Sequence, residues 1–307
     1  MDLFFAILVD NIVPIFLIIL IGYVIGKKFP LDIYTLTKIN IYVFVPALIL
    51  VKLTETEVTR ELAGAIGFTF LVILAAGLLV TGIARLRKSS PSMANAMKNA
   101  VSFYNSGNMG LPLIMLIFDQ LPQAVAIQIM VLLAQNLATN TVGLYNANRG
   151  NKGVKGSLLQ VLKTPSIYAV TLGFLFKWLK VDLTKFFFWP APVFISNGLV
   201  SIALLTLGIQ LSRVKVNFKN VDVYIAGFLR LIGGPLIAGL LIFLFGYEGI
   251  TAQVLLISSS VPTAVNTALL AVEFRNEPDF ASQVVMTTTL LSPITMSCVA
   301  YIAQRLF

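Results

Sequence analysis

Two apolar stretches of this chain are interrupted by residues that destabilise a helix inside a lipid bilayer. They are Phe103-Tyr-Asn-Ser-Gly-Asn-Met-Gly-Leu-Pro-Leu113 and Ser258-Ser-Ser-Val-Pro-Thr-Ala-Val-Asn-Thr267. Because a bilayer offers no water to unpaired backbone groups, irregular backbone persists there only where it lines a cavity or is buried in protein. Two interrupted segments at matching places in the two halves of a chain are typical of the binding site of a membrane transporter.

The composition excludes a soluble domain. Hydrophobic residues make up 58% of the 307 residues and charged residues 11%, whereas charged residues are about 25% of an average soluble protein. We therefore predict an all-α integral membrane protein. There is no His and a single Cys, so we expect neither a metal site nor a cofactor. The sequence shows no nucleotide-binding loop and no catalytic triad, so we do not expect an enzyme.

Ten apolar runs are long enough to cross a bilayer, which takes about 20 residues of helix. They cover residues 4–26, 33–51, 63–84, 95–118, 122–147, 164–181, 190–211, 222–246, 251–272 and 280–304. The two interruptions fall in the fourth run of each half. We predict a five-helix repeat over residues 1–148, a linker over 149–163 and a second five-helix repeat over 164–307. An odd number of spans per repeat inverts the second repeat relative to the first.

The placement of the basic residues predicts the orientation in the membrane. Most Lys and Arg residues lie in loops on the side opposite the N-terminus, including Lys27, Arg85, Lys152 and Arg213. By the positive-inside rule this side is cytoplasmic, so we expect a cytoplasmic linker and extracytoplasmic termini. The net charge of +9 then reflects the topology of a multi-pass protein of the cell membrane, surrounded by lipid. We expect no nucleic-acid partner.

The residues of the two interruptions are suited to hold a small anion. Prolines free backbone groups, glycines allow close approach, and side-chain amides supply donors and acceptors. If the two stretches cross, the partly positive N-terminal ends of two half-helices meet there. The candidate substrate-binding residues are Asn105, Asn108, Gly110, Pro112, Pro262, Thr263, Asn266 and Thr267. The alternative is a pair of proline kinks whose amides bond neighbouring helices.

Further polar residues inside the apolar runs are candidates for a supporting site or an ion site. They are Asn40, Gln135, Asn136, Asn140, Ser292 and Arg230. Oxygen ligands among them could coordinate a Na⁺ ion, and the alternative is hydrogen bonding between helices. Asn40 forms, with Pro46, another local interruption. Arg230 is an intramembrane charge and therefore a functional candidate, although its side chain could also reach the cytoplasmic interface.

These motifs resemble the auxin efflux carrier family, which includes plant auxin exporters and bacterial permeases for malate and malonate. The resemblance covers almost the whole chain. It rests on Asn105–Leu113, Val261–Asn266, Phe274–Asp279, Leu207–Leu211 and the pair Asn40 and Pro46. Because the long loop of many plant members is absent, the chain looks like a compact bacterial member of the malate and malonate permease type.

The resemblance implies ten spans in two inverted repeats, and a homodimer. It also implies a scaffold made from spans 1, 2, 6 and 7, and a transport unit made from spans 3–5 and 8–10. Substrate would bind where the fourth and ninth helices cross, with Asn105, Pro112 and Pro262 at matching motif positions. The plant pattern differs at Asn108 and Thr267, and these replacements predict a more polar pocket.

We therefore expect a secondary transporter of a small organic anion working by elevator-type alternating access. The substrate would be a mono- or dicarboxylate such as malate or malonate, or an auxin-like acid. A membrane-embedded sensor or receptor that binds a ligand without moving it is the alternative, and a channel is a third interpretation. Uniport, exchange and Na⁺ coupling are all compatible with the residues.

Overall fold

The computed structural model describes residues 3–57, 59–148, 165–214 and 220–307. Within these residues every regular element is helical, and one isolated backbone pairing joins Tyr104 to Thr263. The prediction of an all-α membrane protein is confirmed to this extent. The predicted linker over 149–163 lies outside the described residues.

Among the described residues, seven helical segments are long and apolar enough to cross a membrane. Four lie in the first half of the chain: Leu3–Lys28, with α1 (Leu3–Ala6), η1 (Ile7–Ile12) and α2 (Val13–Lys28); Ile33–Glu55, with α3 (Ile33–Ile39), η2 (Asn40–Phe44) and α4 (Val45–Glu55); α5 (Arg60–Leu86); and Pro122–Ala147, with α8 (Pro122–Ala138), η4 (Thr139–Gly143) and α9 (Leu144–Ala147). Three lie in the second half: Pro190–Leu211, with α12 (Pro190–Asn197) and α13 (Leu199–Leu211); Val221–Phe245, with α14 (Val221–Phe228), η6 (Leu229–Gly233) and α15 (Gly234–Phe245); and α18 (Pro278–Leu306).

The other three apolar runs form shorter helices. Residues 164–181 contain α11 (Pro165–Trp178), and the 3₁₀ turn η5 (Leu183–Lys185) follows it. The fourth run is divided into α6 (Pro91–Ser102) and the pair η3 (Ser106–Gly110) and α7 (Leu111–Ile117). The ninth run is divided into α16 (Gly249–Ser259) and α17 (Val265–Glu273). Both sequence interruptions are therefore true breaks in the helix.

Four of the five π-helical turns in the described chain end two residues before a proline. These turns are η1, η2, η3 and η6, which precede Pro14, Pro46, Pro112 and Pro235. Proline donates no backbone hydrogen bond, and its ring collides with the carbonyl one turn earlier. A wider turn ahead of the proline relieves that collision. The predicted interruption at Asn40 and Pro46 is accordingly a widened turn inside a continuous helix.

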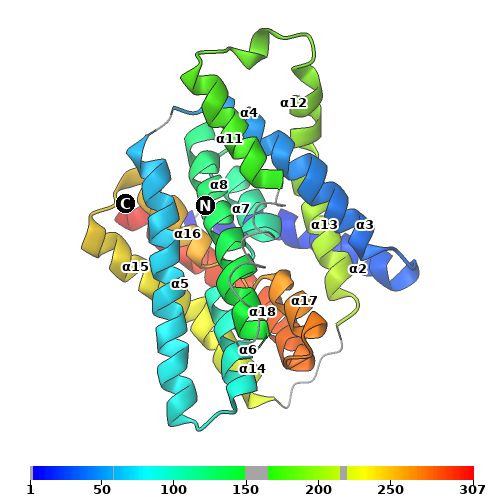
Figure 1. The fold of residues 1–307 in the computed structure, drawn as a ribbon, viewed down its shortest axis with the longest axis vertical. Helices are drawn as coiled ribbons and strands as arrows, with labels where there is room; N and C mark the ends of the chain where they lie inside the picture. The colour runs from blue at the N-terminus through cyan, green and yellow to red at the C-terminus, as the bar shows by residue number, and fades with distance from the viewer. Residues whose placement is uncertain (1–2, 58, 149–164, 215–219) are drawn as a thin grey trace.

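The helices form two groups that are visible in Figure 1. In the upper right, α13 packs along α2, while α11 and α12 pack against α4. To the left and below lie α5, α6 and α14 to α18, and α8 packs against both α5 and α4. The first group, with the rest of the first two spans (α1, η1, α3 and η2), is called the scaffold group below, and the second, with η3, α7 to α9, η4 and η6, the crossing group.

Two glycines allow the helices of the scaffold group to touch closely. A Cβ atom on Gly208 of α13 would lie 2.7 Å from the backbone nitrogen of Tyr23 in α2. A Cβ atom on Gly22 of α2 would lie 2.9 Å from the Cα of Leu205. Small residues at such contacts let membrane helices pack backbone to backbone.

The surface of the molecule is apolar and its interior contains polar groups. Large hydrophobic side chains such as Leu78, Phe194, Leu236 and Phe243 are more than half exposed. Gln128 and many Ser and Thr side chains are buried. This distribution is expected where lipid surrounds the protein, because lipid chains carry no penalty for contact with apolar side chains.

Candidate functional site

The two breaks pair with each other through their backbones. The N–H of Asn105 donates to the carbonyl of Pro262 over 2.8 Å, and the N–H of Ala264 donates to the carbonyl of Phe103 over 3.0 Å. These bonds flank the antiparallel pairing of Tyr104 and Thr263. The fourth and ninth segments therefore cross at their breaks, and their freed backbone groups satisfy one another as a membrane interior requires.

Thr263 fixes the crossing to its surroundings. Its hydroxyl donates to the carbonyl of Ala100 in α6 over 2.8 Å, and its N–H donates to the hydroxyl of Thr288 in α18 over 3.2 Å. All three residues are fully buried. Thr263 thus joins both broken segments to the long helix α18.

Asn105 begins the second half of the fourth segment. Its side-chain oxygen accepts the N–H of Asn108 over 3.1 Å, which is the bond an N-cap residue makes. The side-chain oxygen of Asn108 in turn accepts a hydrogen bond from Nδ2 of Asn40 in η2 over 3.0 Å. The three amides therefore form a chain from the crossing to the second span.

A cavity of about 530 Å³ lies against this chain of amides. Its lining comes from both groups of helices, and it includes these polar and aromatic residues: Tyr34, Thr37, Lys38, Asn40, Tyr42, Tyr104, Asn105, Ser106, Asn108, Gln135, Asn136, Thr139, Asn140, Ser166, Gln210 and Asn266. The volume lies within the range of about 300–1,000 Å³ that is usual for small-molecule sites.

The structure brings half of the sequence candidates to this cavity. Those that line it are Asn40, Asn105, Asn108, Gln135, Asn136, Asn140 and Asn266. Those outside its lining are Gly110, Pro112, Arg230, Pro262, Thr263, Thr267 and Ser292. The residues in the second set are all buried, and they shape the backbone and its packing around the cavity. Thr267 and Ser292 donate their hydroxyl groups to carbonyls of their own helices, at Ala264 and Thr289.

The electrostatics of the cavity favour an anion. The N-terminal ends of η3 and α17 border it, and helix N-termini carry a partial positive charge. Gly107, Val265 and Asn266 lie in the first turns of these helices, where backbone N–H groups have no partner within the helix itself. The described lining contains Lys38 and no acidic side chain. The ammonium group of Lys38 lies 4.3 Å from the ring centre of Tyr34.

Several side-chain amides around the cavity also have spare hydrogen-bonding capacity. Both amide atoms of Gln135 are without a partner, and so are Nδ2 of Asn105 and Oδ1 of Asn40. Oε1 of Gln210 is another such atom. Buried polar atoms are normally bonded, so an unpaired cluster at a cavity indicates a place for a ligand or water. The mixture of donors and acceptors suits a ligand that has both.

Arg230 is outside the cavity lining but lies next to Tyr104, which lines it. The sequence allowed its side chain to reach the membrane interface, but the structure shows it fully buried. Nη1 donates to the carbonyl of Val101 over 2.8 Å, and Nη2 donates to the carbonyl of Ser259. The sequence hypothesis that Arg230 snorkels to the cytoplasm is therefore wrong, because two backbone carbonyls bind it inside the protein.

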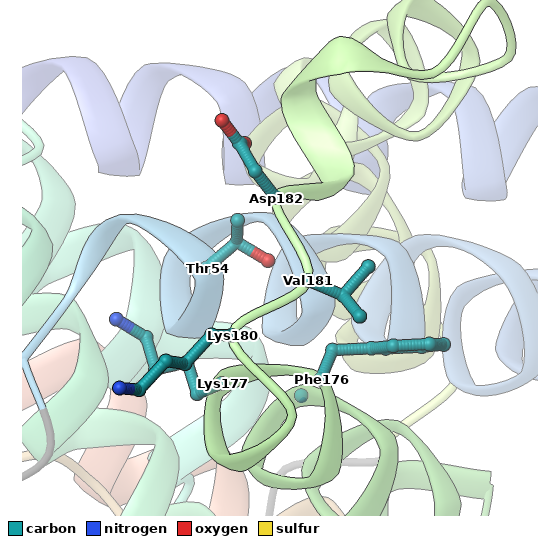
Figure 2. Close-up of a pocket in the computed structure, with 7 residues that line it drawn as sticks. Thr54, Phe176, Lys177, Lys180, Val181 and Asp182 are labelled. Atoms are coloured by element: carbon teal, nitrogen blue, oxygen red, sulfur yellow. The ribbon is translucent and has the colours of Figure 1, made fainter.

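A smaller cavity of about 240 Å³ lies elsewhere, where the ends of α4 and α11 meet (Figure 2). Thr54, Phe176, Lys177, Lys180 and Asp182 line it, and the two lysine side chains point to the same side. None of the crossing residues borders this cavity. It is therefore separate from the candidate site.

Several lining residues were not among the sequence candidates, and Tyr34, Lys38, Tyr104 and Gln210 are four of them. Tyr34 and Lys38 lie four residues apart, and Ile41 and Val45 continue the same helical face, so a helical-face analysis of the second span could have found them. Gln210 is a lone polar residue in the run Leu207–Leu211. Within the described residues no group of His, Cys, Asp or Glu could hold a metal ion.

A multi-span helical fold with a polar cavity at two crossed, broken helices defines a membrane transporter. Comparison with known families agrees, since residues 7–300 match the model of a family described as "Membrane transport protein". The chain belongs to this family, and the resemblance to auxin efflux carriers is confirmed.

Two archaeal proteins are similar along nearly their whole length. An uncharacterized transporter of Methanothermobacter thermautotrophicus is 22% identical, and the match covers 94% of this chain and 95% of that protein. An uncharacterized transporter of Methanocaldococcus jannaschii is 25% identical, with 91% and 94% covered. Both relatives are named as transporters, which favours transport over enzymatic catalysis for this chain.

Proposed function

We propose that this protein is a secondary transporter of a small organic anion and that the anion binds in the cavity at the crossing. The observation that carries this proposal is the cavity lining, in which two helix N-termini and Lys38 are present and acidic side chains are absent from the described part. An anion there is stabilised by unpaired N–H groups and by positive charge together. Malate, malonate and auxin-like acids are the candidate substrates.

The cavity fits a polar carboxylate better than a purely apolar one. Asn105 and Gln135 offer unpaired amide nitrogens, while Asn40 and Gln210 offer unpaired amide oxygens. A carboxylate can accept from the nitrogens and a hydroxyl group can donate to the oxygens. This favours a hydroxy acid such as malate among the candidates.

We further propose ten spans in two inverted five-helix repeats, residues 1–148 and 164–307. The seven long segments, the two broken helices and α11 supply one helical segment for each predicted span. In this arrangement spans 1, 2, 6 and 7 form the scaffold, and spans 3–5 and 8–10 form the transport unit. These sets correspond to the scaffold group and the crossing group.

The hydrogen bonds between spans support a movable transport unit. Among the described residues, the bond from Asn40 to Asn108 is the single side-chain hydrogen bond that joins the two groups. The other bonds between spans stay within a group, such as Thr251 to Glu61 in the crossing group and Gln210 to Thr37 in the scaffold group. A boundary crossed by a single side-chain hydrogen bond among the described residues allows one unit to slide past the other, as elevator-type alternating access requires.

The structure corresponds to an inward-facing state in this proposal. The cavity extends from the crossing toward Lys38, in the first helix of the second span, and toward Pro165, where the sixth span begins. The distribution of Lys and Arg assigns that side to the cytoplasm and both termini to the outside of the cell membrane. A homodimer and coupling to Na⁺ are further proposals, which cross-linking and transport under a Na⁺ gradient would test.

Uptake into proteoliposomes tests the function. Labelled malate, malonate and indole-3-acetate are offered to the parent protein and to the variants Asn105→Ala and Asn266→Ala. Asn197→Ala is a matched control, because Asn197 is exposed and outside the cavity. We expect uptake of at least one carboxylate by the parent and the control, and a reduction of about tenfold or more in both cavity variants.

Three results would contradict the proposal in different ways. Full uptake in both cavity variants would refute the assignment of the site. Binding of a carboxylate without flux would favour a sensor or receptor instead. Flux that neither saturates nor shows counterflow would favour a channel.

A further inference from the structure

Arg230 contacts the ends of both broken helices at the same time. Val101 is the penultimate residue of α6 and Ser259 is the last residue of α16. Their carbonyls accept from Nη1 and Nη2 of Arg230, which lies in the widened turn η6. The side chain is fully buried, and no salt bridge joins it to an acidic residue among the described residues.

The charges at this contact balance. The last carbonyls of a helix are unpaired, and the C-terminal end of a helix carries the equivalent of roughly half a negative charge. Two such ends therefore offset the single positive charge of one guanidinium group. This explains how a buried arginine without a carboxylate partner is tolerated inside the membrane, where an uncompensated charge is very unfavourable.

Tyr104 links Arg230 to the cavity. The guanidinium carbon lies 4.8 Å from the ring centre of Tyr104, and Tyr104 lines the cavity. Without Arg230, the two negative helix ends would face the same crossing as the two positive helix ends. The field at the cavity would then be less favourable to an anion, because the negative ends would be uncompensated.

We propose that Arg230 is a positioning residue that neutralises the C-terminal ends of α6 and α16. The N-terminal ends of η3 and α17 then determine the electrostatic field in the cavity. The proposal rests on the proposed function in so far as the ligand is an anion. Arg230 does not touch the ligand. It acts through the geometry and the charge of the crossing.

Gly234 provides a way to move the guanidinium without removing its charge. Gly234 lies one turn after Arg230, and a Cβ atom there would collide with Nη2 and lie 2.7 Å from Cζ. A methyl group at Gly234 must therefore displace the guanidinium from its carbonyls. The neighbouring Gly233 has no atom closer than 3.9 Å to such a Cβ, so Gly233→Ala is a matched control.

The first experiment measures the effect of charge on ligand binding. Malonate, a dianion, and malonamate, a monoanion of similar size, are titrated against the parent protein and Arg230→Gln. Because the dianion carries twice the charge, we expect Arg230→Gln to weaken malonate binding about tenfold and malonamate binding about threefold. Arg230→Lys, which restores the charge, should recover most of the preference for malonate. Equal losses for both ligands, or no recovery with lysine, would overturn the electrostatic role.

The second experiment is independent of any ligand. Hydrogen exchange of the N–H groups of Asn105 and Ala264 reports whether the crossing is intact, since both donate across it. We expect faster exchange by tenfold or more in Gly234→Ala, with parent rates in Gly233→Ala. Unchanged exchange in Gly234→Ala would refute the clamping role. If the parent binds neither malonate nor malonamate, the anion assignment fails for these probes, while hydrogen exchange still decides whether Arg230 holds the crossing.

Discussion

Nδ2 of Asn40 donates a hydrogen bond to Oδ1 of Asn108 over 3.0 Å, from the second span to the broken fourth segment. Among the described residues this bond alone connects side chains of the two groups of helices. Both residues line the cavity. In the proposed mechanism the bond must break whenever the crossing moves relative to the scaffold, so it should bias the protein toward the inward-facing state.

Replacing Asn40 should weaken that bias. A neutral hydrogen bond contributes about 0.5–1.5 kcal/mol net, so Asn40→Ala should shift the ratio of the two states by about two- to tenfold. The measurement is alkylation of Thr37→Cys from the cytoplasmic side in a Cys298→Ser background, because Thr37 lines the cavity. We expect slower labelling when Asn40→Ala is added. An unchanged or faster rate would show that the bond does not hold the inward-facing state.

Thr263 should contribute measurably to the stability of the crossing. Thr263→Val keeps the shape of the side chain but leaves the buried carbonyl of Ala100 without its donor. We expect a loss of about 1–3 kcal/mol in the free energy of unfolding. Thr81→Val is the control, because its half-buried hydroxyl bonds only the carbonyl of Gly77 in the same helix. Denaturation in detergent measures both, and equal small effects would contradict the prediction.

Gly208 should be essential for the packing of the scaffold group. A methyl group there meets the backbone of α2, which cannot move aside as a flexible side chain can. We expect Gly208→Ala to destabilise the protein by about 1–3 kcal/mol or more, as overpacking does. Gly82→Ala in α5 has open space around its Cβ and should be neutral or slightly stabilising. Comparable melting temperatures for the two variants would contradict the close contact of α2 and α13.

Lys38 should strengthen anion binding without being required for folding. Lys38→Gln removes the one charged side chain in the described cavity lining, so the KM for a transported dianion should rise about tenfold. Lys28→Gln is the matched control, since Lys28 is exposed at the end of α2 and outside the lining. A KM that responds equally to both changes would indicate a general surface effect.

Much of the fold could be predicted because membrane spans are long apolar runs and breaks require Pro, Gly and Asn. The break between Ser102 and Ser106 and the break between Ser259 and Val265 lie where the sequence placed them. The widened turns were not predicted, because hydropathy does not report hydrogen-bond spacing along a helix. Four of them end two residues before a proline (Pro14, Pro46, Pro112 and Pro235), so these prolines could have been used to predict their positions.

Part of the cavity lining could be predicted from the sequence for a different reason. Amides such as Asn105 and Asn266 are conspicuous inside apolar runs, and they do line the cavity. Lys38 lies within the predicted second span, but its place in the cavity lining depends on how that span packs against the other helices. The role of Arg230 depends on two carbonyls that lie 129 and 29 residues away in the chain. Contacts of that kind follow from tertiary packing, which no local pattern encodes.

Ligand protection of a cysteine in the cavity tests the central claim most directly. Leu269 lines the cavity and is about half exposed, so Leu269→Cys in a Cys298→Ser background should react with a soluble alkylating reagent. Lys180→Cys, in the separate smaller cavity, is the control. We predict that saturating malate, malonate or indole-3-acetate, whichever is transported, slows alkylation at position 269 by at least fivefold and leaves position 180 unchanged. Equal alkylation rates at position 269 with and without the transported carboxylate would contradict binding at the helix crossing.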